Sequence, residues 1–220
     1  VSISPEPPEI VAEEPRALIF HARDDAKAPL EATREAMLRG WRRMAAFALF
    51  FQWSAVVAED VPKAIADAWA SDAKDLGWGG LLPWHFKDNW MKSFESLRGP
   101  FNTGGLVLAP ILSELILNRY LTSDVWPFVE DICNSWGDME QVVPAHFEAP
   151  VRASAQDWRD AFRRGLGEPP PGSSGNPLNN LFGFLGPPPG PRALEADLQY
   201  LRNISTFLAS TGITDPPEQL

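Results

Sequence analysis

The distribution of proline is the strongest constraint on how this chain can fold. The sequence holds 22 prolines, and each of them lacks a backbone N–H and is excluded from a helix interior. Four lie within the first 16 residues, and eight lie, together with six glycines, within residues 167–192. We therefore expect residues 1–16 to be extended and residues 167–192 to form a linker or an extended strap.

The sequence between these two stretches carries helix signals. Apolar spacing, N-cap residues and terminal glycines predict six or seven helices, over about 30–57, 60–76, 91–97, 105–119, 124–136, 154–164 and 193–211. Asp60 and Ser154 are the clearest N-cap residues. Residues 16–22 and 141–147 are the candidate strands, and isolated strands are unstable. Their partners would have to lie outside this sequence, or the segments are loops. The expected fold class is mainly α with a few short β-strands.

Three segments are expected along the chain. A helix-rich partial α/β domain covers residues 1–166, an extended arm covers 167–192, and a C-terminal helix in 193–220 packs back on the domain. The arm carries an apolar stretch that a flexible linker would not need. We expect this stretch to supply interaction anchors: Leu181, Phe182, Phe184 and Leu185.

Composition excludes several classes of protein. A formal net charge of −10 argues against a nucleic-acid binder and disfavours electrostatic docking on anionic lipid. Cys133 is the one cysteine, so neither an intramolecular disulfide nor a zinc site built from several cysteines can form. Nine tryptophans imply a large core or a large interface. We expect no cofactor, and contact with a pigment or a lipid is the alternative.

The apolar run over residues 44–57 supports two interpretations. It is about 14 residues long, whereas a membrane-spanning helix needs roughly 20. A helix buried on most faces is the simpler interpretation, and an interface with a membrane or with partner subunits is the other. We therefore predict that the run does not cross a bilayer.

The candidate metal-site residues are few. His21 stands beside Asp24 and Asp25, which could support acid–base work or metal binding, or could form a capping and salt-bridge cluster. His146 lies at the end of the strand predicted over 141–147, where metal ligands often lie, although a lone histidine there is more often a buried structural residue. A catalytic metal site usually needs three protein ligands. We predict that this chain coordinates no metal ion and has no complete catalytic site.

Five long blocks resemble a plant and algal family of plastid proteins, known as a domain of unknown function with a degenerate metallo-β-lactamase-like fold. The blocks are PRALIFHARDDA, RGWRRMAAFALFF, GLVLAPILSELILNR, VVPAHFEAPVRASAQDWRDAF and LEADLQYLRNISTFLASTG, at residues 15–26, 39–51, 105–119, 142–162 and 194–212. The resemblance implies that the chain is the helical C-terminal layer of such an α/β domain, without the β-rich N-terminal half. It also implies that His146 corresponds to the last metal-ligand histidine of that fold and that the other ligands would lie in the absent half. We group His146 with His21, Asp24 and Asp25 as candidate vestigial metal-site residues.

The favoured function is therefore a non-catalytic structural or interaction protein of the plastid. The resemblance places it in the chloroplast, in the stroma or on the stromal face of the thylakoid, as an accessory subunit of a photosynthetic complex. Its expected partners are proteins of a larger assembly, with membrane contact only through them. The alternatives are a metal-dependent hydrolase of the metallo-β-lactamase-like class and a pigment- or lipid-contacting module.

Overall fold

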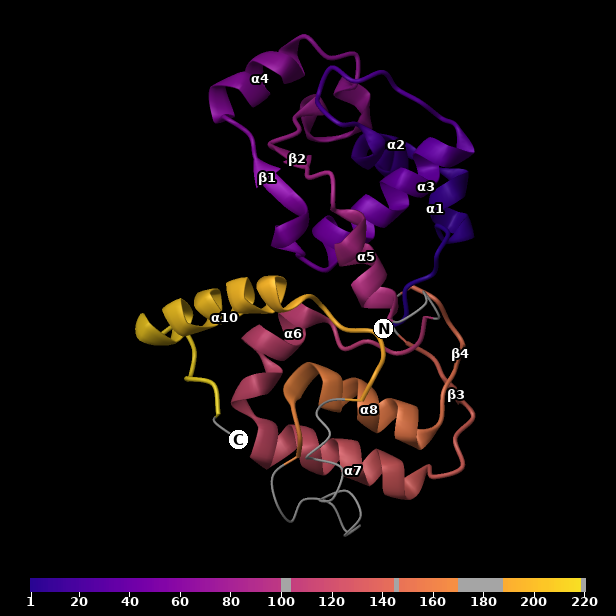
Figure 1. The fold of residues 1–220 in the computed structure, drawn as a ribbon, viewed down its shortest axis with the longest axis vertical. Coiled ribbons are helices and arrows are strands. Elements are labelled where there is room, and N and C mark those ends of the chain that lie inside the picture. The colour runs from indigo at the N-terminus through magenta and orange to yellow at the C-terminus, as the bar shows by residue number, and fades with distance from the viewer. Residues whose placement is uncertain (100–103, 145–146, 170–187, 219–220) are drawn as a thin grey trace. The chain divides into compact units, whose positions relative to one another are not determined.

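The computed structural model describes residues 1–99, 104–144, 147–169 and 188–218 (Figure 1). These residues are mainly helical with two small two-stranded sheets, which confirms the expected fold class. The chain divides into two compact units, an N-terminal unit of Ser4–Glu95 and a C-terminal unit of Val1–Ile3 with Ser96–Leu220. One boundary lies between Ile3 and Ser4, and the other falls inside helix α5 (Met91–Arg98). The division cuts across residues 1–166, which the sequence groups as one domain.

The N-terminal unit is built around a pair of packed helices. Its elements are α1 (Glu9–Glu13), α2 (Arg16–Ala22), α3 (Arg34–Arg43), a π-helical turn (Met44–Leu49), β1 (Val56–Ala58), α4 (Val61–Trp69), β2 (Trp84–Phe86) and the start of α5, with single 3-10 turns at Trp53–Ala55, Lys74–Leu76 and Trp78–Gly80. Helices α2 and α3 meet at Gly40, where a Cβ atom would lie 1.9 Å from the carbonyl oxygen of Leu18. Only glycine allows this approach. Leu18 and Trp41 are fully buried beside it.

Three expectations for this unit are wrong. Residues 16–22 form a helix instead of a strand, because seven residues carry too little periodicity to separate the two and packing on α3 selects the helix. Residues 1–16 contain the short helix α1, which begins directly after Pro8, a position that tolerates proline. The long helix over 30–57 ends as α3 at Arg43, continues as a π-helical turn, and stops before Phe51, whose φ is 55°.

The apolar run over 44–57 is nevertheless largely buried. Ala45, Ala46, Phe47 and Phe50 are buried, and the run then enters strand β1. Strand β1 pairs antiparallel with β2, with Val56 opposite Phe86 and Ala58 opposite Trp84. Neither β1 nor β2 is among the predicted strands, and the two pair with each other within the chain.

The C-terminal unit is a group of helices with one small sheet. It contains the end of α5, α6 (Pro110–Leu115), α7 (Trp126–Ser135), β3 (Gln141–Val142), β4 (Val151–Arg152), α8 (Ala155–Leu166) and α10 (Glu195–Ser210), with a 3-10 turn at Leu117–Arg119 and a π-helical turn at Leu121–Val125. Figure 1 shows α10 beside α6, and α7 beside α8. Strands β3 and β4 pair antiparallel, so the strand predicted at 141–147 exists but spans only two residues.

Two local signals in this unit behave as predicted. Ser154 forms a capping box with Asp157 at the start of α8, since each side chain accepts a hydrogen bond from the other residue's backbone N–H. Helix α10 ends at Ser210, and Gly212 follows with a φ of 73°. Trp126 and Val129 of α7 form a core with Leu121 and Val125, against which Trp158 and Phe162 of α8 pack, among others.

Candidate functional site

Helix α4 is held in place by a cap that the sequence predicts. The Asp60 carboxylate accepts a hydrogen bond from the backbone N–H of Lys63 at 3.0 Å, and Pro62 occupies the first turn. The helix ends at Trp69 and is shorter than the predicted 60–76. The cap fixes the residue at which the helix begins.

The inward face of α4 carries small side chains and one carboxylate. Its buried residues are Ala64, Asp67 and Ala68. The Asp67 carboxylate pairs with the ammonium groups of Lys27 at 2.6 Å and Lys63 at 3.0 Å. Hydrogen bonds from these two lysines, Lys27 first, lower the pKa of Asp67, so its carboxylate stays ionised.

The outward face of α4 is large and apolar. Val61, Ile65 and Trp69 follow one another at intervals of four residues, so they lie on one side of the helix. Their exposed fractions are 64%, 46% and 77%. Helices of globular proteins normally turn such a stripe toward the core, and α4 does the reverse.

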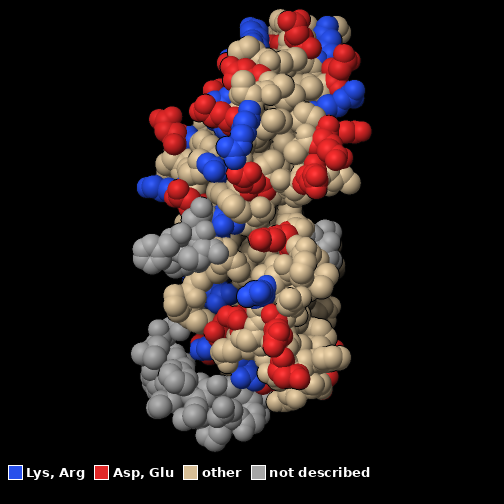
Figure 2. Space-filling view, turned by 90° about the vertical axis from the view of Figure 1, so that its right-hand side faces the viewer, with Lys and Arg blue, Asp and Glu red and all other residues tan. Residues whose placement is uncertain are grey.

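A groove of about 410 Å³ lies beside this stripe. Ile65, Ala68 and Trp69 form one wall, and further along the chain Lys74, Gly79 and Leu81 complete it. We call Val61, Ile65, Trp69 and this groove the α4 apolar face. On the view in Figure 2, by contrast, Lys, Arg, Asp and Glu side chains are interspersed over the surface.

The predicted metal-site residues of the N-terminal unit serve local contacts. The ring centroid of His21 lies 5.1 Å from that of Phe20, and the His21 ring stacks on Trp84 with a centroid distance of 6.4 Å. Burial, followed by the nearby guanidinium groups of Arg23 and Arg43, lowers the pKa of His21 to about 4. Its Nδ1 atom is buried and has no hydrogen-bond partner among the described residues.

The two neighbouring carboxylates have partners of their own. Asp24 pairs with Arg43 at 2.6 Å, and Asp25 accepts a hydrogen bond from the backbone N–H of Lys27 at 2.8 Å. Within the part of the chain that the structure describes, no three His, Cys, Asp or Glu side chains gather as metal ligands. His146 and the expected anchors at 181–185 lie outside the described residues.

The sequence carried a signal for the α4 apolar face that periodicity alone could not interpret. Val61, Ile65 and Trp69 form a regular apolar stripe, and such a stripe predicts a buried face by default. Only the structure shows that the alanines and Asp67 face inward instead.

The comparisons with known proteins identify a family without a function. Residues 1–164 match the family described as a domain of unknown function, DUF4336. No curated protein and no solved structure matches the chain. Among the described residues, no helix combines the length and apolar character needed to cross a bilayer.

Proposed function

We propose that this chain, which belongs to the DUF4336 family, is a non-catalytic interaction protein whose α4 apolar face binds a partner protein. One observation carries the proposal: the large apolar side chains of α4 face solvent, while two alanines and Asp67 occupy its inward face. Leaving three large apolar side chains in water forgoes the free energy that their burial would supply. A partner that covers them recovers that free energy.

A protein fits this face better than a lipid surface does. Exposed tryptophans beside a groove are typical anchors of protein interfaces, because an indole buries a large area with little loss of side-chain entropy. The chain carries a net charge of −10, which disfavours approach to anionic lipid. We therefore assign the face to an apolar side chain of another protein, inserted beside Trp69.

The proposal extends to the location of the protein. The likeness of five sequence blocks to plant and algal plastid proteins supports a chloroplast protein, in the stroma or on the stromal face of the thylakoid. There it would be an accessory subunit of a photosynthetic complex, with its partners supplying any contact with the membrane.

The test is the native mass of the particle that contains this chain, in an extract of the organism that produces it. We expect a particle far heavier than the chain alone, and we expect Trp69→Glu to release the chain from it. Trp136→Glu is the matched control, because Trp136 is also exposed, at 61%, but lies at the end of α7. Release by neither variant would contradict the proposal, and a particle of twice the chain's mass would make the partner a second copy.

A further inference from the structure

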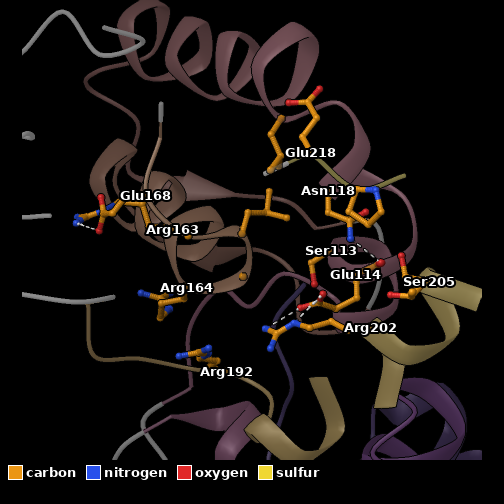
Figure 3. A pocket seen from close by; sticks show the side chains of 16 residues that line it. Ser113, Glu114, Asn118, Arg163, Arg164, Glu168, Arg192, Arg202, Ser205 and Glu218 are labelled. Carbon is orange, nitrogen blue, oxygen red and sulfur yellow. Dashed lines mark hydrogen bonds and ion pairs between the residues drawn. The ribbon is translucent and has the colours of Figure 1, made fainter. Parts of the chain in front are cut away.

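A cleft of about 620 Å³ lies within the C-terminal unit (Figure 3). It is bounded by α6, the C-terminal end of α8, α10 and the chain around Pro217 and Glu218. This volume is in the range of sites for small organic ligands. Four arginines line the cleft: Arg163, Arg164, Arg192 and Arg202.

Two of these arginines are satisfied by carboxylates. Arg163 pairs with Glu168 at 2.6 Å and with Asp160 at 3.2 Å. Arg202 donates hydrogen bonds to Glu114 at 3.2 Å and to Glu195 at 2.5 Å. The charges of Arg163 and Arg202 are therefore balanced within the chain, whereas those of Arg164 and Arg192 are balanced less completely.

Arg164 is a buried cation that forms no ion pair with a described carboxylate, although Asp160 and Asp157 on the same helix lie near enough to favour its charge. It is 9% exposed, and burial lowers the pKa of its guanidinium group. Its Nε atom donates to the carbonyl oxygen of Pro191 at 3.3 Å, and its Nη2 atom donates to that of Leu106 at 2.9 Å. Neither acceptor carries a charge, and the Nη1 atom has no partner in the described part of the chain. Burial of a guanidinium that no carboxylate contacts directly is costly, and an anionic ligand in contact with it would offset that cost.

Arg192 adds a second incompletely paired cation next to the first. It follows Pro191, the residue whose carbonyl oxygen holds Arg164. Its one carboxylate contact within the described residues is Glu195 at 3.4 Å, and Arg202 holds the same carboxylate at 2.5 Å. The Nε atom of Arg192 is buried without a partner among the described residues. Figure 3 shows Arg164 and Arg192 along the same side of the cleft.

We propose that this cleft binds an organic phosphate, with its phosphoryl group held between Arg164 and Arg192. Guanidinium groups present N–H pairs that match phosphate oxygens, and a phosphoryl group with nearly two negative charges balances two guanidinium ions. The lining of the cleft also includes Leu121, Leu166 and Pro217, which can cover an apolar body attached to the phosphate. This site is separate from the α4 apolar face and does not depend on the proposed function.

The experiment is isothermal titration calorimetry of the full chain with phenyl phosphate, inorganic phosphate and benzoate at constant ionic strength. Phenyl phosphate is expected to bind with a dissociation constant below about 1 mM and roughly tenfold more tightly than either of the other two. Arg192→Gln is expected to weaken its binding about tenfold or more, since a charge-assisted hydrogen bond is lost. Arg34→Gln is the control, because Arg34 is exposed, pairs only with Glu6 among the described residues and belongs to the other unit; it is expected to change the affinity less than twofold.

Arg164→Gln is expected to weaken binding further, with circular dichroism reporting whether the fold survives. Because Arg164 also holds two backbone carbonyls, Arg192→Gln decides the matter if the Arg164 variant unfolds. The proposal is overturned if the dissociation constant for phenyl phosphate exceeds about 1 mM, or if Arg34→Gln weakens binding as much as Arg192→Gln does. If benzoate binds as tightly as phenyl phosphate, the cleft does not select a phosphoryl group. If inorganic phosphate binds as tightly as phenyl phosphate, the cleft does not recognise the organic group attached to the phosphate.

Discussion

Helices α4 and α7 begin alike and turn opposite faces inward. Each opens with a large apolar residue followed by proline, Val61-Pro62 in α4 and Trp126-Pro127 in α7. Helix α7 buries its first residue, Trp126, completely, whereas α4 leaves Val61, Ile65 and Trp69 in solvent. An apolar stripe in the sequence therefore identifies one face of a helix but does not indicate what covers that face. In α7 the cover is α8, and in α4 we propose a partner protein.

Replacing Trp126 of α7 and Trp69 of α4 should give the largest difference in stability between the two helices. Trp126→Ala empties a core position in α7, so we expect a loss of about 3–5 kcal/mol in the free energy of unfolding. Trp69→Ala removes an exposed ring, and its effect should stay within about 0.5 kcal/mol. Urea denaturation followed by far-UV circular dichroism measures both. Similar losses for the two variants would mean that Trp69 is packed within this chain.

Acid should act on the N-terminal unit through His21. The pKa of His21 is lowered from 6.5 to about 4 in the folded chain. Between these pH values the imidazole is therefore protonated in the unfolded chain and neutral in the folded chain. Stability is therefore full above pH 6.5 and falls as the pH drops toward 4, by up to about 3 kcal/mol.

The matched variant is His21→Phe, which removes the titrating group from a site between aromatic rings. Denaturation midpoints at pH 7 and pH 4.5 should differ less for this variant than for the wild-type chain. An unchanged difference would mean that the ring of His21 is free to ionise in the folded state.

The N-caps of α4 and α8 should contribute about equally. Asp60→Ala and Ser154→Ala each remove a side-chain acceptor from a helix N-terminus, and each should cost about 1 kcal/mol. The same denaturation experiment applies. A much larger cost at Asp60 would indicate that the orientation of α4, and not only its first turn, depends on this cap.

The sequence was sufficient for local structure where a single side chain decides it. Asp60 and Ser154 cap helices as predicted, because the cap needs only residues three positions apart. The end of α3 at Arg43 was missed because residues 44–57 are nearly all apolar and carry no proline or glycine to stop a helix. There the left-handed conformation of Phe51 is imposed by tertiary packing rather than by the residue itself.

Contacts between distant residues could not be predicted in the same way. Arg164 meets the carbonyls of Leu106 and Pro191 only once α8 is folded against both segments, so no local pattern marked the cleft. Trp136, the last residue of the helix predicted over 124–136, lies just past the end of α7 and is 61% exposed. The likeness to a metallo-β-lactamase-like layer stays a prediction.

Oxidative footprinting of the tryptophans tests most directly whether α4 is a contact surface. The isolated chain and the native particle are exposed to hydroxyl radicals in parallel, and modification at Trp69, Trp126 and Trp136 is measured by mass spectrometry. In the isolated chain, Trp69 and Trp136 should react and buried Trp126 should not. In the native particle Trp69 should become protected, because a partner's side chain covers it. Equal modification of Trp69 in both samples would show that its outward face stays open to water, and the interaction role assigned to α4 would be wrong.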